Sequence, residues 1–283
     1  FLLNRSSDLR KYNQILIRQL SQTNPACLGG FGSCRLSINP VYCNAHGVTM
    51  KPWVKFPSKF VLDGRLKELL WTDDKVGKPS HKVAALKLYI ALSMRAESKE
   101  AFCHYIDTYI TYYSAQATYE ELSELTALSR SSISSGIDIL ERLGLLSVDK
   151  VRRKNIYRFP GFDGSKDWCK MPCRALLSRD GKRIEAFHKL KLRSKIELYA
   201  LKMFIYLCAV RDNHSHYTSA SFERINLQTS IPEADIPRTH AYLSGIGLIA
   251  LVEKRKDGFG GMKKNPPNSY FVTGHNDFFI GKR

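Results

Sequence analysis

Residues 53–60 read WVKFPSKF, and residues 168–175 read WCKMPCRA. Both stretches fit the pattern Trp-x-Lys-[Phe/Met]-Pro-x-[Lys/Arg], and they lie 115 residues apart. Residues 86–92 (LKLYIAL) match residues 201–207 (LKMFIYL) at the same offset of 115. A repeat with a period of more than a hundred residues indicates two copies of one domain, because solenoid repeats are much shorter.

The repeat continues beyond these segments at a different offset. Residues 222–249 match residues 119–146 at an offset of 103, so that Leu243 corresponds to Leu140. The change of offset places extra residues of the first copy around 102–117. We expect this stretch to be a connection, because insertions are tolerated best between secondary-structure elements.

Residues 119–146 follow the pattern of two short helices joined by a turn. Ser129 is a good N-cap for the second helix, and Gly144 suits its left-handed C-terminal position. Ile133, Ile137 and Leu140 fall on one face of that helix. Two strands are predicted to follow, at residues 145–148 and 155–159, with a basic turn between them. Helix, turn, helix and hairpin together predict a winged helix-turn-helix.

We therefore expect a mostly α chain with small β-wings (α+β), built from two tandem winged helix-turn-helix domains. The predicted boundaries are an N-terminal helix and loop extension at residues 1–50, a first domain at 51–160 and a second at 161–283. In this interpretation the repeated phrase is the entry strand of each domain. Trp53 and Trp168 are then expected to pack against their own domains.

The composition restricts the classes of partner. The 283 residues carry a formal net charge of +18 and a pI of about 9.6. Such a charge favours nucleic acid, an acidic membrane surface or simply solvent. No apolar run approaches the ~20 residues of a membrane span. The seven cysteines are irregularly spaced, which is typical of reduced thiols. We expect a cytoplasmic protein that does not bind a membrane.

The predicted second helix of the first copy has the polar side chains that a DNA-reading helix needs. Arg130 can reach a guanine edge or a phosphate, and the outer face of its own helix carries no opposing carboxylate. The hairpin turn beside the helix is basic and suits phosphate contact. The predicted DNA-binding residues of this copy are Arg130, Ser131, Ser132, Ser134, Ser135, Lys150, Arg152, Arg153 and Lys154.

The corresponding helix of the second copy, at residues 232–242, differs in charge. Glu233 and Asp235 occupy positions where carboxylates repel phosphate, and Pro237 must lie in the first turn or kink the helix. We expect the first copy to read bases and the second to contact phosphate or protein. The predicted contacts of the second copy are Arg238, Thr239, Lys254, Arg255, Lys256, Lys263 and Lys264.

Two further interpretations compete with simple DNA binding. Cys27, Cys34, Cys43 and His46 could supply four zinc ligands, although their gaps fit no common zinc-finger spacing. His214 and His216 form a pair of the kind that single-strand nickases use to hold a divalent ion, but the intervening Ser215 is not bulky and apolar. We expect neither site to be used, and we predict a protein without catalytic activity, metal or cofactor.

Residues 53–159 resemble the helix-turn-helix domains of phage and plasmid replication proteins. The resemblance rests on residues 56–65, on the helix around residues 86–96 and on residues 119–146. Two such domains in tandem are similar to iteron-binding plasmid initiators. The resemblance implies double-stranded DNA as the partner, a dimerisation role for one domain and contact with replication machinery. A replication initiator of a mobile element is the first hypothesis, and a transcriptional regulator is the alternative.

Overall fold

The computed structural model describes residues 43–44, 47–48, 50–103, 107–151, 154–253 and 267–279. The chain divides into two compact units, residues 1–47 and 48–283, and the second unit contains both repeats. Two short strands, β1 (Cys43–Asn44) and β2 (Gly47–Val48), pair with each other. The helix expected near the N-terminus lies outside the described residues. All that follows concerns the second unit.

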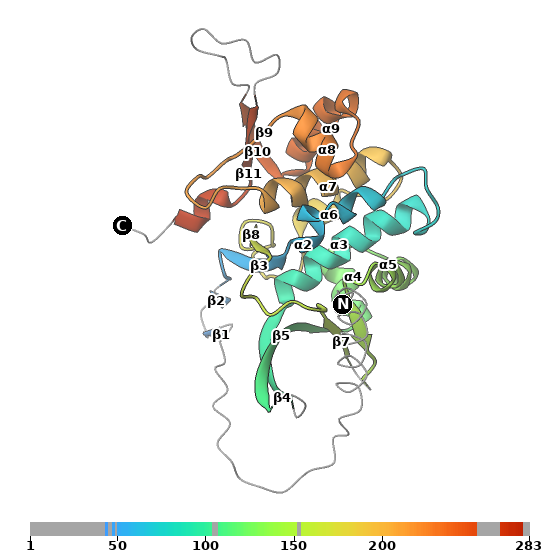
Figure 1. Cartoon of the computed structure of the whole chain (residues 1–283), viewed down its shortest axis with the longest axis vertical. Helices are drawn as coiled ribbons and strands as arrows, with labels where there is room; N and C mark the ends of the chain where they lie inside the picture. Colours follow the sequence, from blue (N-terminus) through green and yellow to red (C-terminus); the bar gives the residue numbers. More distant parts are fainter. Residues whose placement is uncertain are drawn as a thin grey trace, which may run out of the picture. The chain divides into compact units, whose positions relative to one another are not determined.

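The first repeat begins with one strand of a two-stranded sheet and ends in a hairpin (Figure 1). Four of its strands form an antiparallel sheet in the order β4-β5-β7-β6. Its elements are β3 (Trp53–Pro57), α2 (Lys59–Leu62), the 3-10 helix η1 (Arg65–Glu68), α3 (Pro79–Arg95), β4 (Glu97–Cys103), β5 (Thr108–Ala117), α4 (Tyr119–Thr126), α5 (Arg130–Arg142), β6 (Ser147–Asp149) and β7 (Asn155–Arg158).

The second repeat follows a similar plan, but one short strand, β9, precedes its paired helices where the first repeat has the β4–β5 hairpin. Three of its strands form an antiparallel sheet in the order β10-β11-β9. Its elements are β8 (Trp168–Pro172), α6 (Glu185–His188), α7 (Lys195–Ala209), β9 (Thr218–Ala220), α8 (Phe222–Thr229), η2 (Glu233–Asp235), α9 (Ile236–Ile246), β10 (Ile249–Glu253), β11 (Asn268–Val272) and η3 (His275–Phe279).

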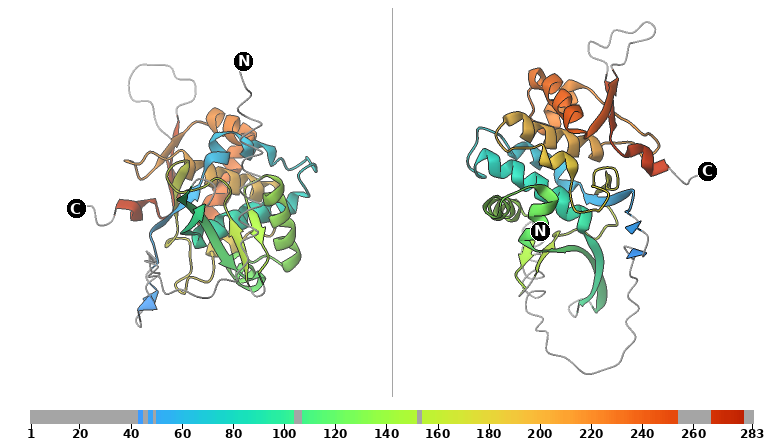
Figure 2. Two further views of the ribbon diagram at one scale, coloured as in Figure 1. Left: turned by 60° about the horizontal axis from the view of Figure 1, so that its bottom comes forward. Right: turned by 180° about the vertical axis from the view of Figure 1, so that it is seen from behind.

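The expectation of a mostly α chain with small wings is wrong. In the described part of the second unit, eight α-helices accompany three antiparallel sheets, and the fold is α+β. The largest difference is around residues 102–117, where a connection was expected and most of the long β4–β5 hairpin, residues 97–117, is found (Figure 2). Residues 108–113 (TYITYY) are β-branched or aromatic, a composition that favours strands.

The two copies of the repeated phrase pair with each other. Strands β3 and β8 are antiparallel, with Lys55 opposite Lys170 at the centre and each tryptophan opposite a proline at the ends. The rings of Trp53 and Trp168 stack with centroids 5.9 Å apart and planes 6° apart. Trp53 and Trp168 therefore pack against each other, a contact between the repeats that was not predicted, and Trp168 also packs against the hydrophobic core.

The lysines of these strands complete a crossed arrangement. Lys55 Nζ lies 4.9 Å from the ring centroid of Trp168, and Lys170 Nζ lies 5.0 Å from that of Trp53. A cation over an aromatic face is attracted by the negative potential of that face. Each strand therefore places its lysine on the tryptophan of the other strand. The phrase occurs twice because both halves of this contact need the same residues.

The central helices α3 and α7 form the second contact between the repeats (Figure 1). Residues 82–93 of α3 and 196–208 of α7 are buried without interruption. A helix that is buried on all sides needs no polar face, because other elements surround it. Both helices are therefore core elements, and they form the common centre of the second unit.

Two buried lysines at equivalent positions of α3 and α7 reach across this contact. Lys87 Nζ donates to the carbonyl of Phe187 at 3.0 Å, and Lys202 Nζ donates to the carbonyl of Leu69 at 3.0 Å. Both lysines are 0% exposed. Burial lowers the pKa of Lys87 to about 8, although Glu197 acts to raise it. Burial and the charge of Lys82 lower the pKa of Lys202 to about 7.

The close packing of α5 on α3 depends on a glycine. A Cβ added to Gly136 would lie 2.7 Å from Leu88 Cδ1, 3.1 Å from the backbone nitrogen of Ala85 and 3.2 Å from the carbonyl carbon of Ala84. Two of these three atoms belong to the backbone of α3, so a side chain at residue 136 cannot be accommodated by rotamer changes alone. The glycine thus sets how near the two helices approach.

Replacing Gly136 with alanine should destabilise the protein by roughly 1–3 kcal/mol, because α5 must move away from α3. The matched control is Gly245→Ala in α9, where an added Cβ meets nothing within 4 Å. That change should leave the unfolding free energy unchanged or raise it by up to about 1 kcal/mol, since alanine favours a helix. Urea unfolding measures both. Equal values for the two variants would contradict the packing argument.

The free energy of unfolding should increase as the pH rises from about 7 to 9. The pKa of Lys202 is lower in the folded state than its ordinary value of 10.5. Between about pH 7 and 9 the unfolded chain therefore binds more protons than the folded protein, so a lower pH favours unfolding. The slope from one such group is at most about 1.4 kcal/mol per pH unit. Lys202→Met should flatten the slope, and Lys75→Met, at an exposed position, should not. An unchanged slope in Lys202→Met would contradict the assignment.

Candidate nucleic-acid interface

Helices α4 and α5 are joined by a three-residue turn that local hydrogen bonds define. The hydroxyl of Thr118 accepts from the amide of Glu121, whose carboxylate accepts from the amide of Thr118, and this capping box starts α4. Ala127 then takes a left-handed conformation with φ of 55°. The hydroxyl of Ser129 accepts from the amide of Ser132 and starts α5, which confirms the predicted N-cap.

Helix α5 has the two faces that its sequence predicts. Ile133, Ile137 and Leu140 are buried in the core, as expected. The helix ends at Arg142, and Gly144 has a positive φ of 64° in the position expected for the terminating glycine. The outer face is polar: Arg130, Ser131 and Ser134 are exposed, and Ser132 and Ser135 are half-buried.

Arg130 has an ion-pair partner that was not expected. Its Nη2 donates to Oε1 of Glu120, at the start of α4. The prediction considered the outer face of α5 alone, whereas this carboxylate comes from α4. A hydrogen bond to its own backbone and the charge of Arg130 lower the pKa of Glu120. Both side chains are about two-thirds exposed or more (72% and 68%), and water screens such a pair so that it contributes little to stability.

The β6–β7 hairpin contacts α4 through Glu121, the residue after Glu120. Lys154 Nζ donates to Oε1 of Glu121 at 2.7 Å. Burial acts to raise the pKa of Glu121, but Lys154, the amide of Thr118 and Arg95 outweigh it and lower that pKa. Lys150 is exposed on the hairpin. The predicted contacts Arg152 and Arg153 lie outside the described residues.

Glu120 and Glu121 thus bring together two predicted DNA contacts that are distant in sequence. One carboxylate binds the first residue of α5, and the next binds the hairpin. The structure therefore ties both Arg130 and Lys154 to the first turn of α4. Both cations remain accessible there, with exposed side-chain fractions of 72% and 48%.

The second repeat differs from its prediction in two respects. Glu233 and Asp235 do not belong to the second helix but form the 3-10 turn η2, and α9 begins at Ile236 with Pro237 in its first turn. Thr239 is 0% exposed, and its hydroxyl donates to the carbonyl of Asp235 at 2.8 Å. The prediction that Thr239 contacts DNA is therefore wrong, because the side chain faces the core.

Arg238 remains exposed at the start of α9, as its prediction requires. The carboxylate of Asp235 accepts from Lys195 Nζ at 2.8 Å, so its charge is partly compensated from α7. The remaining predicted contacts of this repeat are in the second hairpin. Lys254, Arg255, Lys256, Lys263 and Lys264 all lie outside the described residues.

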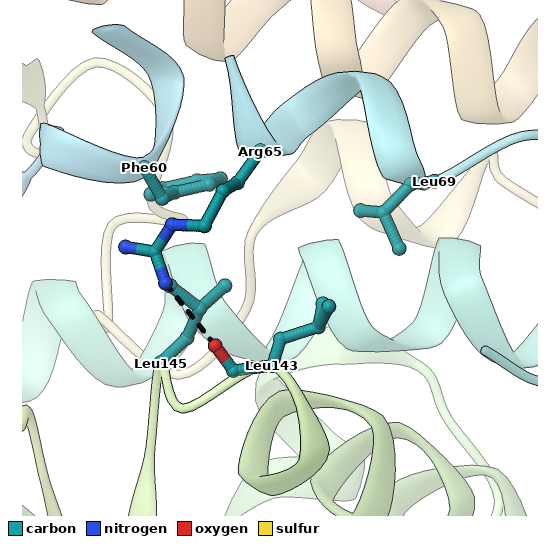
Figure 3. Close-up of a pocket in the computed structure, with 5 residues that line it drawn as sticks. All are labelled: Phe60, Arg65, Leu69, Leu143 and Leu145. Atoms are coloured by element: carbon teal, nitrogen blue, oxygen red, sulfur yellow. Dashed lines mark hydrogen bonds between the residues drawn. The ribbon is translucent and has the colours of Figure 1, made fainter. Parts of the chain in front are cut away.

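A small hollow between η1 and the end of α5 contains no catalytic group (Figure 3). Its lining residues are Phe60, Arg65, Leu69, Leu143 and Leu145. Arg65 Nη1 donates to the carbonyl of Leu143 at 3.3 Å, where the carbonyls at the C-terminus of α5 carry partial negative charge. Arg65 therefore ties the segment before α3 to the end of α5, which is a structural role.

The histidines of the nickase hypothesis lie on an exposed turn after α7. Arg211 donates from Nη1 to the carbonyls of Asp212 and Ser215 at 2.5 Å and 2.7 Å and thereby shapes this turn. The ring of His216 contacts the rings of Tyr217 and Phe271. The described residues include no group of three or more His, Cys, Asp or Glu side chains that could hold a metal ion. The proposed ligands Cys27, Cys34 and His46, and the side chain of Cys43, lie outside the description.

One charged surface was missed in the sequence. Residues 174–195, between β8 and α7, contain eight lysines and arginines but only two carboxylates. The local excess of basic residues is the signal that identifies this segment. The segment belongs neither to the paired helices nor to the hairpins, so the patterns that predict DNA contacts do not include it.

Within the described residues, no helix is long and apolar enough to cross a membrane. Comparison with family models, with curated proteins and with solved structures gave no match. The function must therefore be argued from the side chains of this chain and their geometry.

Proposed function

We propose that this protein binds double-stranded DNA in a sequence-specific manner, as a replication initiator of a plasmid or other mobile element. The observation that carries the proposal is the joint surface of α5 and the β6–β7 hairpin. It combines Arg130 with short polar side chains on a helix and adds Lys154 from the hairpin. A helix of this kind can enter the major groove while the hairpin contacts phosphates.

The exposed ion pairs on this surface are compatible with DNA binding. Water screens the pairs of Arg130 with Glu120 and of Lys154 with Glu121, so exchanging a carboxylate for a phosphate has a small cost. The net charge of +18 adds a favourable long-range interaction with DNA. Glu120 and Glu121 then hold the two cations in place until a phosphate or base replaces them.

Two related units in one chain support the initiator role, since such a chain can contact two sites on one duplex. The resemblance of residues 53–159 to replication proteins supports the same role. Selection of bound duplexes from random and genomic libraries tests the proposal. We expect enrichment of a defined sequence that recurs as direct repeats. A chain that binds no duplex, or that enriches no sequence, would disprove the proposed function.

Arg130→Ala should cost roughly 1–3 kcal/mol on the preferred duplex, because a guanine-binding arginine is lost. The loss on random duplex should be much smaller. Glu120→Gln should tighten binding, because it removes a carboxylate that competes with DNA for Arg130. Arg238→Ala is the control in the second repeat and should change sequence preference less. Fluorescence anisotropy on preferred and random duplexes measures all three variants.

The opposite pattern would reverse this assignment. If Arg238→Ala relaxes the preference while Arg130→Ala preserves it, the second repeat reads the sequence. If Glu120→Gln weakens binding, its carboxylate positions Arg130 for base contact and does not compete with DNA.

A further inference from the structure

The segment between β8 and α7 carries a concentrated positive charge that the equivalent segment of the first repeat lacks. We call residues 174–195 the basic arm. Eight basic and two acidic residues give it a net charge of +6. Residues 59–80, at the offset of 115, have five basic and four acidic residues and a net charge of +1. The charge is therefore specific to the second copy and is not required by the shared fold.

The basic side chains of the arm face solvent while its apolar ones anchor it. Leu176, Ile184, Phe187 and Leu190 are buried in the core. The cations at the two ends of the arm are paired, Arg174 with Asp277 and Lys195 with Asp235. Between these ends lie six exposed cations, none of which forms an ion pair with a carboxylate of the described chain: Arg179, Lys182, Arg183, Lys189, Lys191 and Arg193.

The first three of these cations, Arg179, Lys182 and Arg183, lie on a tight turn whose backbone is ordered by hydrogen bonds. The amide of Ser178 donates to the carbonyl of Arg183 at 2.8 Å, and Leu177 forms an isolated β-bridge with Ile184. The carboxylate of Asp180 accepts from the hydroxyl of Ser178 at 2.5 Å and from the amide of Lys182 at 3.1 Å. The turn is thus ordered without a ligand, which reduces the entropy lost when it binds one.

The arm connects the two helix-turn-helix units. Near α4, the amide of Ile184 donates to the carbonyl of Leu125 at 3.0 Å, and a ring nitrogen of His188 lies 3.2 Å from the carbonyl of Glu124. At the other repeat, Lys189 Nζ donates to the carbonyl of Ile246 at 3.4 Å, at the end of α9. The arm therefore extends from the end of α4 in the first repeat to the end of α9 in the second.

The side chains on the arm favour one class of anionic partner. Proteins that bind single-stranded nucleic acid typically stack bases on exposed Phe, Tyr or Trp rings, and Phe187, the one such residue of the arm, is 0% exposed. Membrane binding requires exposed apolar side chains beside the charges. The large exposed apolar residues of the described chain all lie elsewhere, for example at Leu62 and Leu227. The basic arm has neither exposed Phe, Tyr or Trp rings nor large exposed apolar side chains, so its charges suit the phosphate backbone of a duplex.

We propose that the basic arm binds the sugar-phosphate backbone of the duplex between the sites of the two helix-turn-helix units. This inference rests on the proposed function, because it takes DNA as the ligand. The arm contributes affinity and not sequence preference, since phosphates are the same at every base pair. It also explains why the charge is confined to one of the two equivalent segments, because the arm of one repeat suffices to bridge both units.

The test compares two triple variants that remove the same charge. The first, Arg179→Ala with Lys182→Ala and Arg183→Ala, removes the cations of the ordered turn. The second, Lys67→Ala with Lys75→Ala and Lys78→Ala, removes three cations from the equivalent segment of the first repeat. Binding to the selected duplex and to a random duplex is measured from 50 to 300 mM KCl, roughly the range over which phosphate contacts dominate. Thermal melting shows that each variant folds.

The arm variant should bind both duplexes more weakly by the same factor. Its log–log salt slope should fall by about 0.9 for each lost phosphate contact, and the control should change much less. If the wild-type chain binds duplex but both triples behave alike, the arm inference alone fails. If the wild-type chain binds no duplex, both the proposed function and the arm inference fail. Loss of binding to phosphatidylserine vesicles with unchanged duplex binding would show a membrane partner and overturn the inference.

Discussion

The architecture depends on the crossed contact between two copies of one segment. Strand β3 pairs with β8, and each strand places its lysine on the tryptophan of the other. Behind this sheet, α3 and α7 bury each other, and Lys87 and Lys202 each bind a carbonyl of the opposite repeat. A buried lysine is costly unless its donors are satisfied. The pairing of the repeats is what satisfies them, so neither half provides a complete environment for its own central helix.

This contact determines how the functional surfaces are supported. Helix α5 packs on α3 at Gly136, and the basic arm leads directly into α7. Helix α5 and the basic arm are therefore attached to the two helices that form the common core. A surface supported in this way can bind an extended ligand, such as the duplex that we propose, with little reorganisation. The exposed pairs of Glu120 and Glu121 order the side chains of this surface without burying them.

Local features of the fold could be predicted from the sequence, whereas contacts between distant segments could not. Ser129 as N-cap and the positive φ of Gly144 follow from short-range chemistry, and both predictions are confirmed. The pairing of β3 with β8 has no local signal, because the strands are more than a hundred residues apart in the sequence and only Lys55 lies opposite its own counterpart, Lys170. The β4–β5 hairpin was missed because the comparison of repeats treats an insertion as a connection. In the candidate site, the inward position of Thr239 depends on where α9 begins. The ion pair of Arg130 depends on how α4 packs beside α5. Hydrophobic periodicity specifies neither of these features.

The crossed contact implies that both repeats unfold as one unit, and we propose that they also bind DNA as one unit. A Trp71→Phe background leaves Trp53 and Trp168 as the fluorescent probes of the crossed contact, since the chain has three tryptophans. Thermal unfolding is then followed by this fluorescence and by far-UV circular dichroism, with and without the selected duplex. We predict coincident midpoints for the two probes and an equal upward shift of both with DNA. Separate midpoints, or a shift of the dichroism signal alone, would contradict the account.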